Sequence, residues 1–130
     1  RTDPAEAAEF VAAAGVDALA VAVGSSHAMV ERTAALDLDL IAALVTALPV
    51  PLVLHGSSGV ADDNLRAAVN AGMTKVNIGT ILNVAFTGAV RDVLDGDAKV
   101  VDPRKYLRPA RDEVAAVAAR LASVVSGMPR

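Results

Sequence analysis

The stretch Pro51-Leu52-Val53-Leu54-His55-Gly56-Ser57-Ser58-Gly59 decides the fold class. Its short apolar run shows no alternation, which predicts a parallel strand that is buried on both faces. The Gly-Ser turn that follows leads to Asp62 and Asp63, which open an amphipathic helix that Gly72 closes. The stretch and the helix that follows it are therefore predicted to form one strand–turn–helix unit.

The same pattern occurs on both sides of this unit. An apolar run at residues 18–23 ends in Gly24-Ser25, and a run at residues 75–78 ends in Gly79-Thr80. Helical spacing of apolar residues, with caps and terminators, predicts helices over residues 4–15, 37–48, 62–72, 80–94 and 103–125. Strands that alternate with helices indicate βαβ units, a parallel sheet and right-handed crossovers.

Three strands are too few for a complete domain of this kind. They cannot close a (β/α)₈ barrel, and in an open sheet they would leave two exposed edges. The chain also starts at Arg1 rather than at Met. We therefore expect the last part of a larger α/β domain.

Composition excludes several function classes. The chain has 130 residues and 13.2 kDa, of which 54% are hydrophobic and 2% aromatic, with a formal net charge of −3. This balance argues against disorder and against a basic nucleic-acid surface. No apolar run approaches the roughly 20 residues of a membrane span. The absence of Cys rules out disulfides and thiolate metal sites, and it fits a cytoplasmic protein.

Both histidines of the chain follow predicted strands. His27 comes after the first strand and its Gly-Ser-Ser turn, and His55 ends the second strand. Because parallel strands end at one edge of the sheet, the two imidazoles can converge there and hold zinc or act in catalysis. The alternative is that each histidine is an isolated, hydrogen-bonded loop residue.

Two loops and one helix start could bind anions. The Gly-Ser loop at residues 56–59 precedes a helix N-terminus, and residues 77–80 form a second such loop, although Gly-Ser is also an ordinary turn. A basic cluster of Arg104, Lys105, Arg108 and Arg111 marks the start of the last helix. Such a cluster is either a solvated face or a contact for a second anionic group.

The motifs together resemble the C-terminal half of class II, zinc-dependent ketose-bisphosphate aldolases. The resemblance rests on residues 53–59, 75–80 and 102–104, on Thr2-Asp3-Pro4, and on residues 17–24 leading to His27. It covers nearly the whole chain in order. It implies that residues 1–130 form about the last three βα units of a single (β/α)₈ TIM-barrel domain, whose N-terminal half is absent from this sequence.

The resemblance also implies site residues. His27 and His55 match two of the three zinc ligands, and Arg104 matches the arginine that reaches the other phosphate of a bisphosphate. The phosphate-binding positions are Gly56, Ser57, Ser58, Asn77, Ile78, Gly79 and Thr80. The cofactor implied is Zn²⁺, with a monovalent cation beside the phosphate as a further option. The third histidine and the acid/base carboxylates would lie in the missing half, so no catalytic residue is expected here.

Three positions depart from the family pattern. Ala28 stands where the family usually has Gly, and its methyl group would crowd the phosphate contact. Gly79 stands where Asp is often found. This difference affects the monovalent-cation contact, and a small residue at this position is closer to the tagatose-type branch than to the fructose-type branch. Ser57 replaces a common Gly, a milder change.

The resemblance implies a lyase of carbohydrate metabolism, of the kind used in glycolysis. The complete enzyme would reversibly cleave a ketose 1,6-bisphosphate, fructose or tagatose, to dihydroxyacetone phosphate and glyceraldehyde 3-phosphate. We expect a cytoplasmic homo-oligomer, dimer or tetramer, with a phosphorylated sugar as substrate and without nucleic-acid or membrane partners; the isolated chain should be inactive. One alternative is a non-catalytic, aldolase-like phosphate-binding subunit or fragment. Another is a (β/α)₈ enzyme in which both histidines act as acid/base groups.

Overall fold

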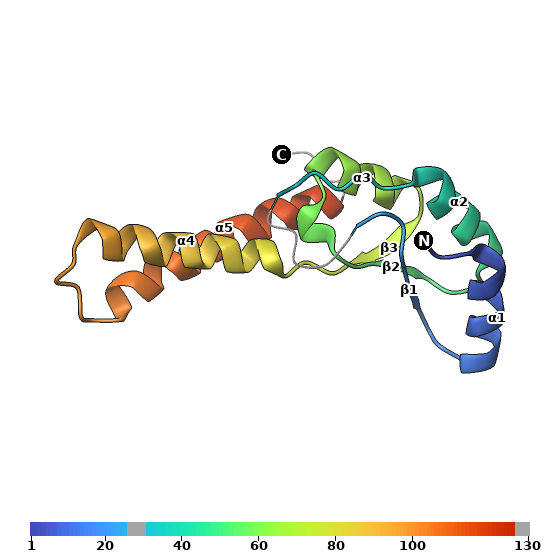
Figure 1. Cartoon of the computed structure of the whole chain (residues 1–130), viewed down its shortest axis with the longest axis horizontal. Helices are drawn as coiled ribbons and strands as arrows, with labels where there is room; N and C mark the ends of the chain where they lie inside the picture. The colour runs from blue at the N-terminus through green and yellow to red at the C-terminus, as the bar shows by residue number, and fades with distance from the viewer. Residues whose placement is uncertain (26–30, 127–130) are drawn as a thin grey trace. The chain divides into compact units, whose positions relative to one another are not determined.

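The computed structural model describes residues 1–25 and 31–126. The chain divides into two compact units, Arg1–Ile78 and Gly79–Arg130 (Figure 1). The first unit contains the sheet and the second contains two long helices.

The first unit alternates helices and strands, as the sequence predicts. Its elements are α1 Pro4–Ala14, β1 Leu19–Val21, α2 Leu38–Ala47, β2 Leu52–Leu54, the 3₁₀ turn η1 Ser57–Gly59, α3 Asp62–Asn70 and β3 Met73–Val76. The strands form a parallel sheet in the order β1-β2-β3. This confirms the α/β class and is consistent with part of a TIM barrel.

Capping residues set the helix ends of this unit. The Asp3 carboxylate accepts hydrogen bonds from the backbone N–H groups of Ala5 and Glu6, and Gly15 ends α1 in the left-handed conformation with φ 64°. The Asp37 carboxylate caps α2 by accepting from the N–H of Leu40 at 3.0 Å. These caps lie where the sequence predicts helices to begin and end.

The core of the first unit is built around the central strand β2. Leu54 pairs in register with Val21 and Val76, and Leu52 with Met73. Leu52 and Leu54 are at most 1% exposed. Helices α2 and α3 connect successive strands, so right-handed crossovers place both on the same side of the sheet. Each neighbouring helix pair, α1 with α2 and α2 with α3, is in contact.

The prediction that every strand is buried on both faces is confirmed for β2 only. All three residues of β2 are buried, but in and after β1 burial alternates, with Val21 and Val23 buried and Ala20 and Ala22 exposed. Among the described residues β1 has a neighbouring strand on one side only, and alanine side chains give its second face little apolar surface to bury. The continuous apolar run at residues 18–23 therefore predicted more burial than β1 has.

The third strand begins two residues earlier than predicted. It spans Met73–Val76 rather than residues 75–78. The exposed polar residues Thr74 and Lys75 interrupt the apolar run, so the sequence pattern does not show that the strand begins at Met73. Gly72 leads into it with φ 116°, and a Cβ there would lie 2.5 Å from the Val45 side chain. A glycine is thus required where β3 starts.

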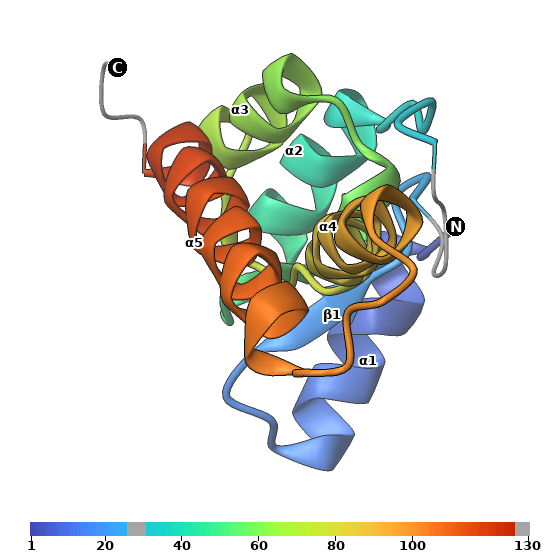
Figure 2. The same ribbon diagram turned by 90° about the vertical axis from the view of Figure 1, so that its left-hand side faces the viewer.

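The second unit is a pair of helices. α4 spans Thr80–Gly96 and α5 spans Arg104–Val125, close to the predicted bounds, and the two pack against each other (Figure 2). No residue of α4 is buried, whereas Ala110, Leu121 and Val124 of α5 are.

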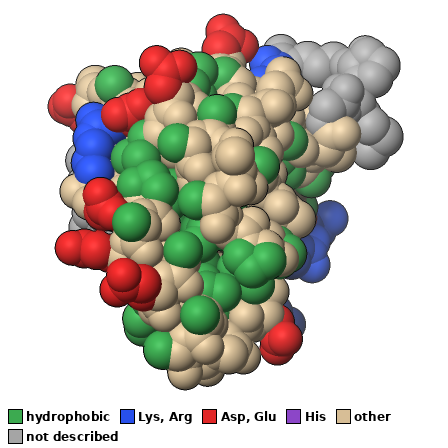
Figure 3. All heavy atoms as spheres, turned by 90° about the vertical axis from the view of Figure 1, so that its right-hand side faces the viewer, with side chains coloured by type: hydrophobic (Ala, Val, Ile, Leu, Met, Phe, Trp, Pro, Cys, Tyr) green, Lys and Arg blue, Asp and Glu red, His purple; other side chains and the backbone are tan. Residues whose placement is uncertain are grey.

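Apolar side chains also remain on the surface. In the first unit the large ones are Phe10, Leu38 and Val45 on α1 and α2. Figure 3 shows one face on which hydrophobic side chains are interspersed with Asp and Glu. Across the described residues, no helix has the length and hydropathy needed to cross a bilayer.

Candidate functional site

The candidate site lies at the carboxyl edge of the sheet. His55 directly follows β2, Asn77 directly follows β3, and Ser25 lies a few residues beyond β1. The ladder continues past β3, since the N–H of Asn77 donates to the carbonyl of Leu54 at 3.0 Å. The topology therefore brings three predicted loops to one edge.

The imidazole of His55 contacts the side-chain amide of Asn77. The Asn77 Nδ2 and His55 Nε2 atoms are 3.3 Å apart, and both residues are partly buried. The Asn77 amide therefore restrains the orientation of the imidazole, and which group donates depends on the tautomer of the ring.

Hydroxyl groups connect the backbones of these loops. The Ser25 hydroxyl donates to the carbonyl of His55 at 2.5 Å, and the Ser57 hydroxyl donates to the carbonyl of Asn77. Ser57 is 2% exposed, so this bond satisfies a buried hydroxyl. Ser25 is a member of this group that the predicted site residues omit, although its Gly-Ser context is the same as that of Ser57.

The loop after His55 is a tight, buried turn. Gly56 has φ 66°, a conformation that glycine adopts readily, and η1 follows over Ser57–Gly59. Ser57 and Ser58 are the buried polar residues of the described chain, at 2% and 8% exposure. The sequence predicts a turn here but not its burial. Because the Ser57 hydroxyl proton is already donated to Asn77, an anion at Ser57 would rely on backbone N–H groups.

The second predicted loop spans the end of one unit and the start of the other. Asn77 and Ile78 close the first unit, and Gly79 is the N-cap of α4, where its carbonyl accepts from the N–H of Leu82 at 2.9 Å. Gly79 has φ −144°, and a Cβ at this position would meet nothing within 4 Å. The backbone therefore does not require glycine at 79, and an aspartate would fit.

Arg104 forms a local ion pair. Its guanidinium lies 2.7 Å from the Asp102 carboxylate, with a side chain that is 88% exposed. Hydrogen bonds from the Arg104 side chain and backbone lower the pKa of Asp102, and the Asp102 carboxylate in turn raises the pKa of Arg104. In the same cluster Arg111 pairs with Asp112 at 2.8 Å. Two of the four predicted basic residues thus have acidic partners within two positions in the sequence.

The described residues do not make a complete metal site. His27, like Ala28, lies outside them, and within residues 1–25 and 31–126 no group of three His, Cys, Asp or Glu side chains could hold a metal ion. A catalytic zinc requires three protein ligands, and the described part supplies one oriented imidazole. The zinc assignment of His27 and His55 therefore stays a prediction.

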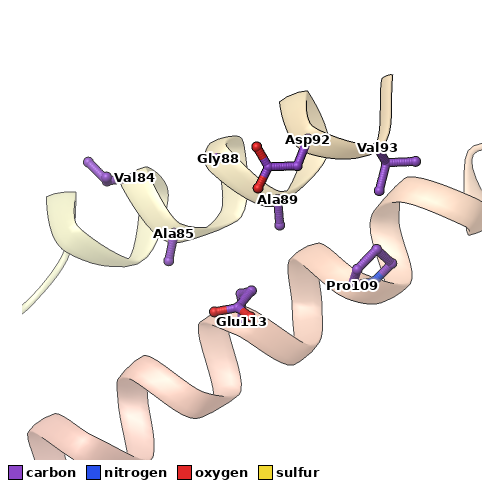
Figure 4. A pocket seen from close by; sticks show the side chains of 8 residues that line it. All are labelled: Val84, Ala85, Gly88, Ala89, Asp92, Val93, Pro109 and Glu113. Atoms are coloured by element: carbon purple, nitrogen blue, oxygen red, sulfur yellow. The ribbon is translucent and has the colours of Figure 1, made fainter. Parts of the chain in front are cut away.

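A separate cavity lies between the helices of the second unit. It measures about 340 Å³ and is lined by small apolar side chains together with Asp92, Pro109 and Glu113 (Figure 4). None of the predicted site residues contributes to it.

Comparison with known proteins gives the family. Residues 1–128 match the family described as fructose-bisphosphate aldolase class-II. The chain belongs to this family. The match covers almost every residue, which confirms the resemblance inferred from the sequence motifs.

Solved structures agree with this class II aldolase assignment. The chain is 34% identical to the YdjI aldolase from Escherichia coli K12, with a TM-score of 0.70 over 96% of this chain. A putative fructose-1,6-biphosphate aldolase from Coccidioides immitis matches with a TM-score of 0.80 at 23% identity over 96%, and the fructose-bisphosphate aldolase of Campylobacter jejuni with 0.78 at 21% over 98%. At those identities the last two show the fold alone. The chain spans 43%, 43% and 46% of these three proteins.

Proposed function

We propose that this chain is the C-terminal part of a zinc-dependent ketose-bisphosphate aldolase. The complete enzyme would cleave fructose or tagatose 1,6-bisphosphate to dihydroxyacetone phosphate and glyceraldehyde 3-phosphate. The observation that carries the proposal is the contact of His55 with Asn77 at the carboxyl edge of the sheet, in a chain of the class II aldolase family. In barrels of this type active sites lie at that edge.

In this proposal His55 is a zinc ligand that Asn77 holds in place. A metal-bound imidazole keeps one lone pair for the metal and donates its other N–H, so with zinc bound the ring would donate to the oxygen of the Asn77 amide. His27 would be the second ligand, and the third would come from the part of the barrel that the longer relatives contain. When bound, zinc acts as a Lewis acid toward the substrate ketone.

The proposed phosphate-binding residues belong to two loops, the buried turn after His55 and residues 77–80. Gly56, Ser57 and Ser58 would bind through backbone N–H groups, and Asn77 to Thr80 would supply the second loop. Arg104 would leave Asp102 and bind the other phosphate of the substrate; the Arg104 side chain is 88% exposed, which keeps its ion pair with Asp102 weak. We further propose a cytoplasmic homo-oligomer, dimer or tetramer.

Cleavage assays on the native polypeptide that contains this chain test the proposal. We expect cleavage of fructose or tagatose 1,6-bisphosphate, loss of activity with excess chelator, and recovery when zinc is added. His55→Ala should lose both bound zinc and turnover. Glu9→Gln, an exposed change on α1, is the control and should behave as wild type.

Two results would contradict the proposal. Full activity in excess chelator would remove the role of the metal. A zinc-replete and active His55→Ala variant would show that the site lies elsewhere.

A second candidate is a non-catalytic, phosphate-binding relative of the aldolases. Ala28 and Gly79 favour it, because both depart from the family pattern at the phosphate loops, and the backbone at Gly79 has room for the side chain that is missing. Such a protein would bind the phosphate group of a ligand whether or not zinc is present.

A further inference from the structure

Arg32 forms a partly buried ion pair beside the candidate phosphate loop. Its Nη1 atom lies 2.6 Å from Oδ1 of Asp62, the first residue of α3, and the two side chains are only 27% and 19% exposed. The Nη2 atom of Arg32 donates to the backbone carbonyl of Val60, a residue that is 0% exposed. One guanidinium thus binds two successive parts of the chain just after the turn η1.

The backbone next to Arg32 makes a second connection to the same place. The N–H of Ala34 donates to the carbonyl of Gly59 at 2.9 Å, and Ala34 forms an isolated parallel bridge with Val60. Ala34 is 6% exposed. The segment from Arg32 to Ala34 therefore holds the exit of the turn.

The entrance of the turn is held by a different set of bonds. The Ser57 hydroxyl donates to the Asn77 carbonyl, and the N–H of Val60 donates back to the Ser57 carbonyl at 3.0 Å. The residues between Gly56 and Val60 are thus fixed at both ends. Loss of either end would free the backbone N–H groups that the proposed phosphate site requires in one orientation.

Arg32 also balances charge at this point. The first turn of α3 carries Asp62 and Asp63, and carboxylates there compete with an anion for the positive end of the helix. Asp63 is 96% exposed and pairs with Arg66, so solvent screens its charge. Asp62 is the shielded carboxylate, and Arg32 is its partner.

We propose that Arg32 is a positioning residue for the anion site at Ser57 and Ser58. It acts through Val60 and Asp62: it fixes the exit of the turn and neutralises the carboxylate at the start of α3, without touching the anion itself. The proposal deepens the proposed function and rests on it.

The test compares two arginines that pair with neighbouring aspartates of the same helix. In the native polypeptide, Arg32→Gln removes the partly buried pair with Asp62, and Arg66→Gln removes the more exposed pair with Asp63 as a matched control. The readouts are the dissociation constant for inorganic phosphate by calorimetry and the separate KM and kcat values for ketose-bisphosphate cleavage.

We expect Arg32→Gln to weaken phosphate binding and raise KM by about tenfold, with a smaller change in kcat, because a displaced turn loses binding geometry. Arg66→Gln should stay within about twofold of wild type, since exposed pairs contribute little. Arg32→Lys keeps the charge but lacks the planar fork that reaches both Val60 and Asp62, so it should recover only part of the loss. It also serves as the test variant if Arg32→Gln fails to fold.

Three outcomes would overturn this proposal. If Arg32→Gln and Arg32→Lys bind phosphate as tightly as wild type, Arg32 does not position the turn. If kcat falls while KM and the phosphate dissociation constant stay unchanged, its role is not at the anion site. If wild type itself binds no phosphate, the anion site is wrong, whereas phosphate binding without cleavage would contradict only the aldolase reaction.

Discussion

The turn after His55 and the start of α5 both carry residues that the family resemblance assigns to phosphate, but they are built differently. In the turn, Ser57 is almost fully buried and bonded to Asn77, twenty residues away. At the start of α5, Arg104 is exposed and bonded to Asp102, two residues away. The first group is held by the fold, and the second by its own local sequence.

This difference predicts how each region responds to change. Residues held by long-range contacts cannot be replaced without disturbing their partners, whereas an exposed local ion pair can exchange partners at little cost. The first region is suited to hold a ligand in fixed geometry. The second is suited to a side chain that moves to meet one.

The largest contrast is expected for core and surface leucines. Leu54→Ala in the first unit removes a side chain that is 0% exposed and should lower the free energy of unfolding by about 2–5 kcal/mol. Leu107→Ala in the second unit removes one that is 43% exposed, and its cost should be about 0.5 kcal/mol or less. Urea unfolding of both variants measures the difference, and equal costs would contradict the comparison.

A smaller contrast is expected for two serines. Ser57→Ala removes the hydrogen bond between a buried hydroxyl and the Asn77 carbonyl, and it should cost about 0.5–1.5 kcal/mol. Ser126→Ala removes an exposed hydroxyl that donates to Ser123 at 3.4 Å, and it should change stability by less than about 0.5 kcal/mol. Urea unfolding midpoints of the two variants, compared at equal dependence of the unfolding free energy on urea, measure the difference in stability. A harmless Ser57→Ala change would mean that the two loops are not connected through this bond.

The smallest effect concerns the ion pair of the second unit. Arg104 lowers the pKa of Asp102, so the pair favours the folded state above the ordinary carboxyl pKa, and this contribution is lost as pH falls through the lowered value. In Arg104→Gln the pKa of Asp102 should rise toward its ordinary value. A carboxyl titration followed by NMR measures this. An unchanged Asp102 titration would show that the pair does not persist in solution.

Local signals in the sequence predicted most of the fold. Asp3, Asp37 and Gly15 act at the helix ends where the pattern places them, because caps depend on nearby backbone groups alone. The strand ends were harder to locate. Burial depends on what covers each face, so the apolar run of β1 did not reveal the exposure of Ala20 and Ala22.

The site was predicted in its loops but not in its connections. Glycine and serine after each strand indicated where His55 and Ser57 would lie. The bonds of Ser57 to Asn77 and of Arg32 to Asp62 join residues 20 and 30 positions apart, and no local pattern reports such pairs. Candidate site residues can thus be identified from their spacing in the sequence. The residues that position them can be identified only from the three-dimensional structure.

The central claim is that this chain contributes to a zinc-dependent aldolase site and not to a phosphate site alone. Calorimetric titration of the metal-depleted native polypeptide with dihydroxyacetone phosphate, with and without added zinc, tests it most directly. We expect binding that is markedly tighter when zinc is present. Equal affinity with and without zinc would contradict it and would identify a phosphate-binding module.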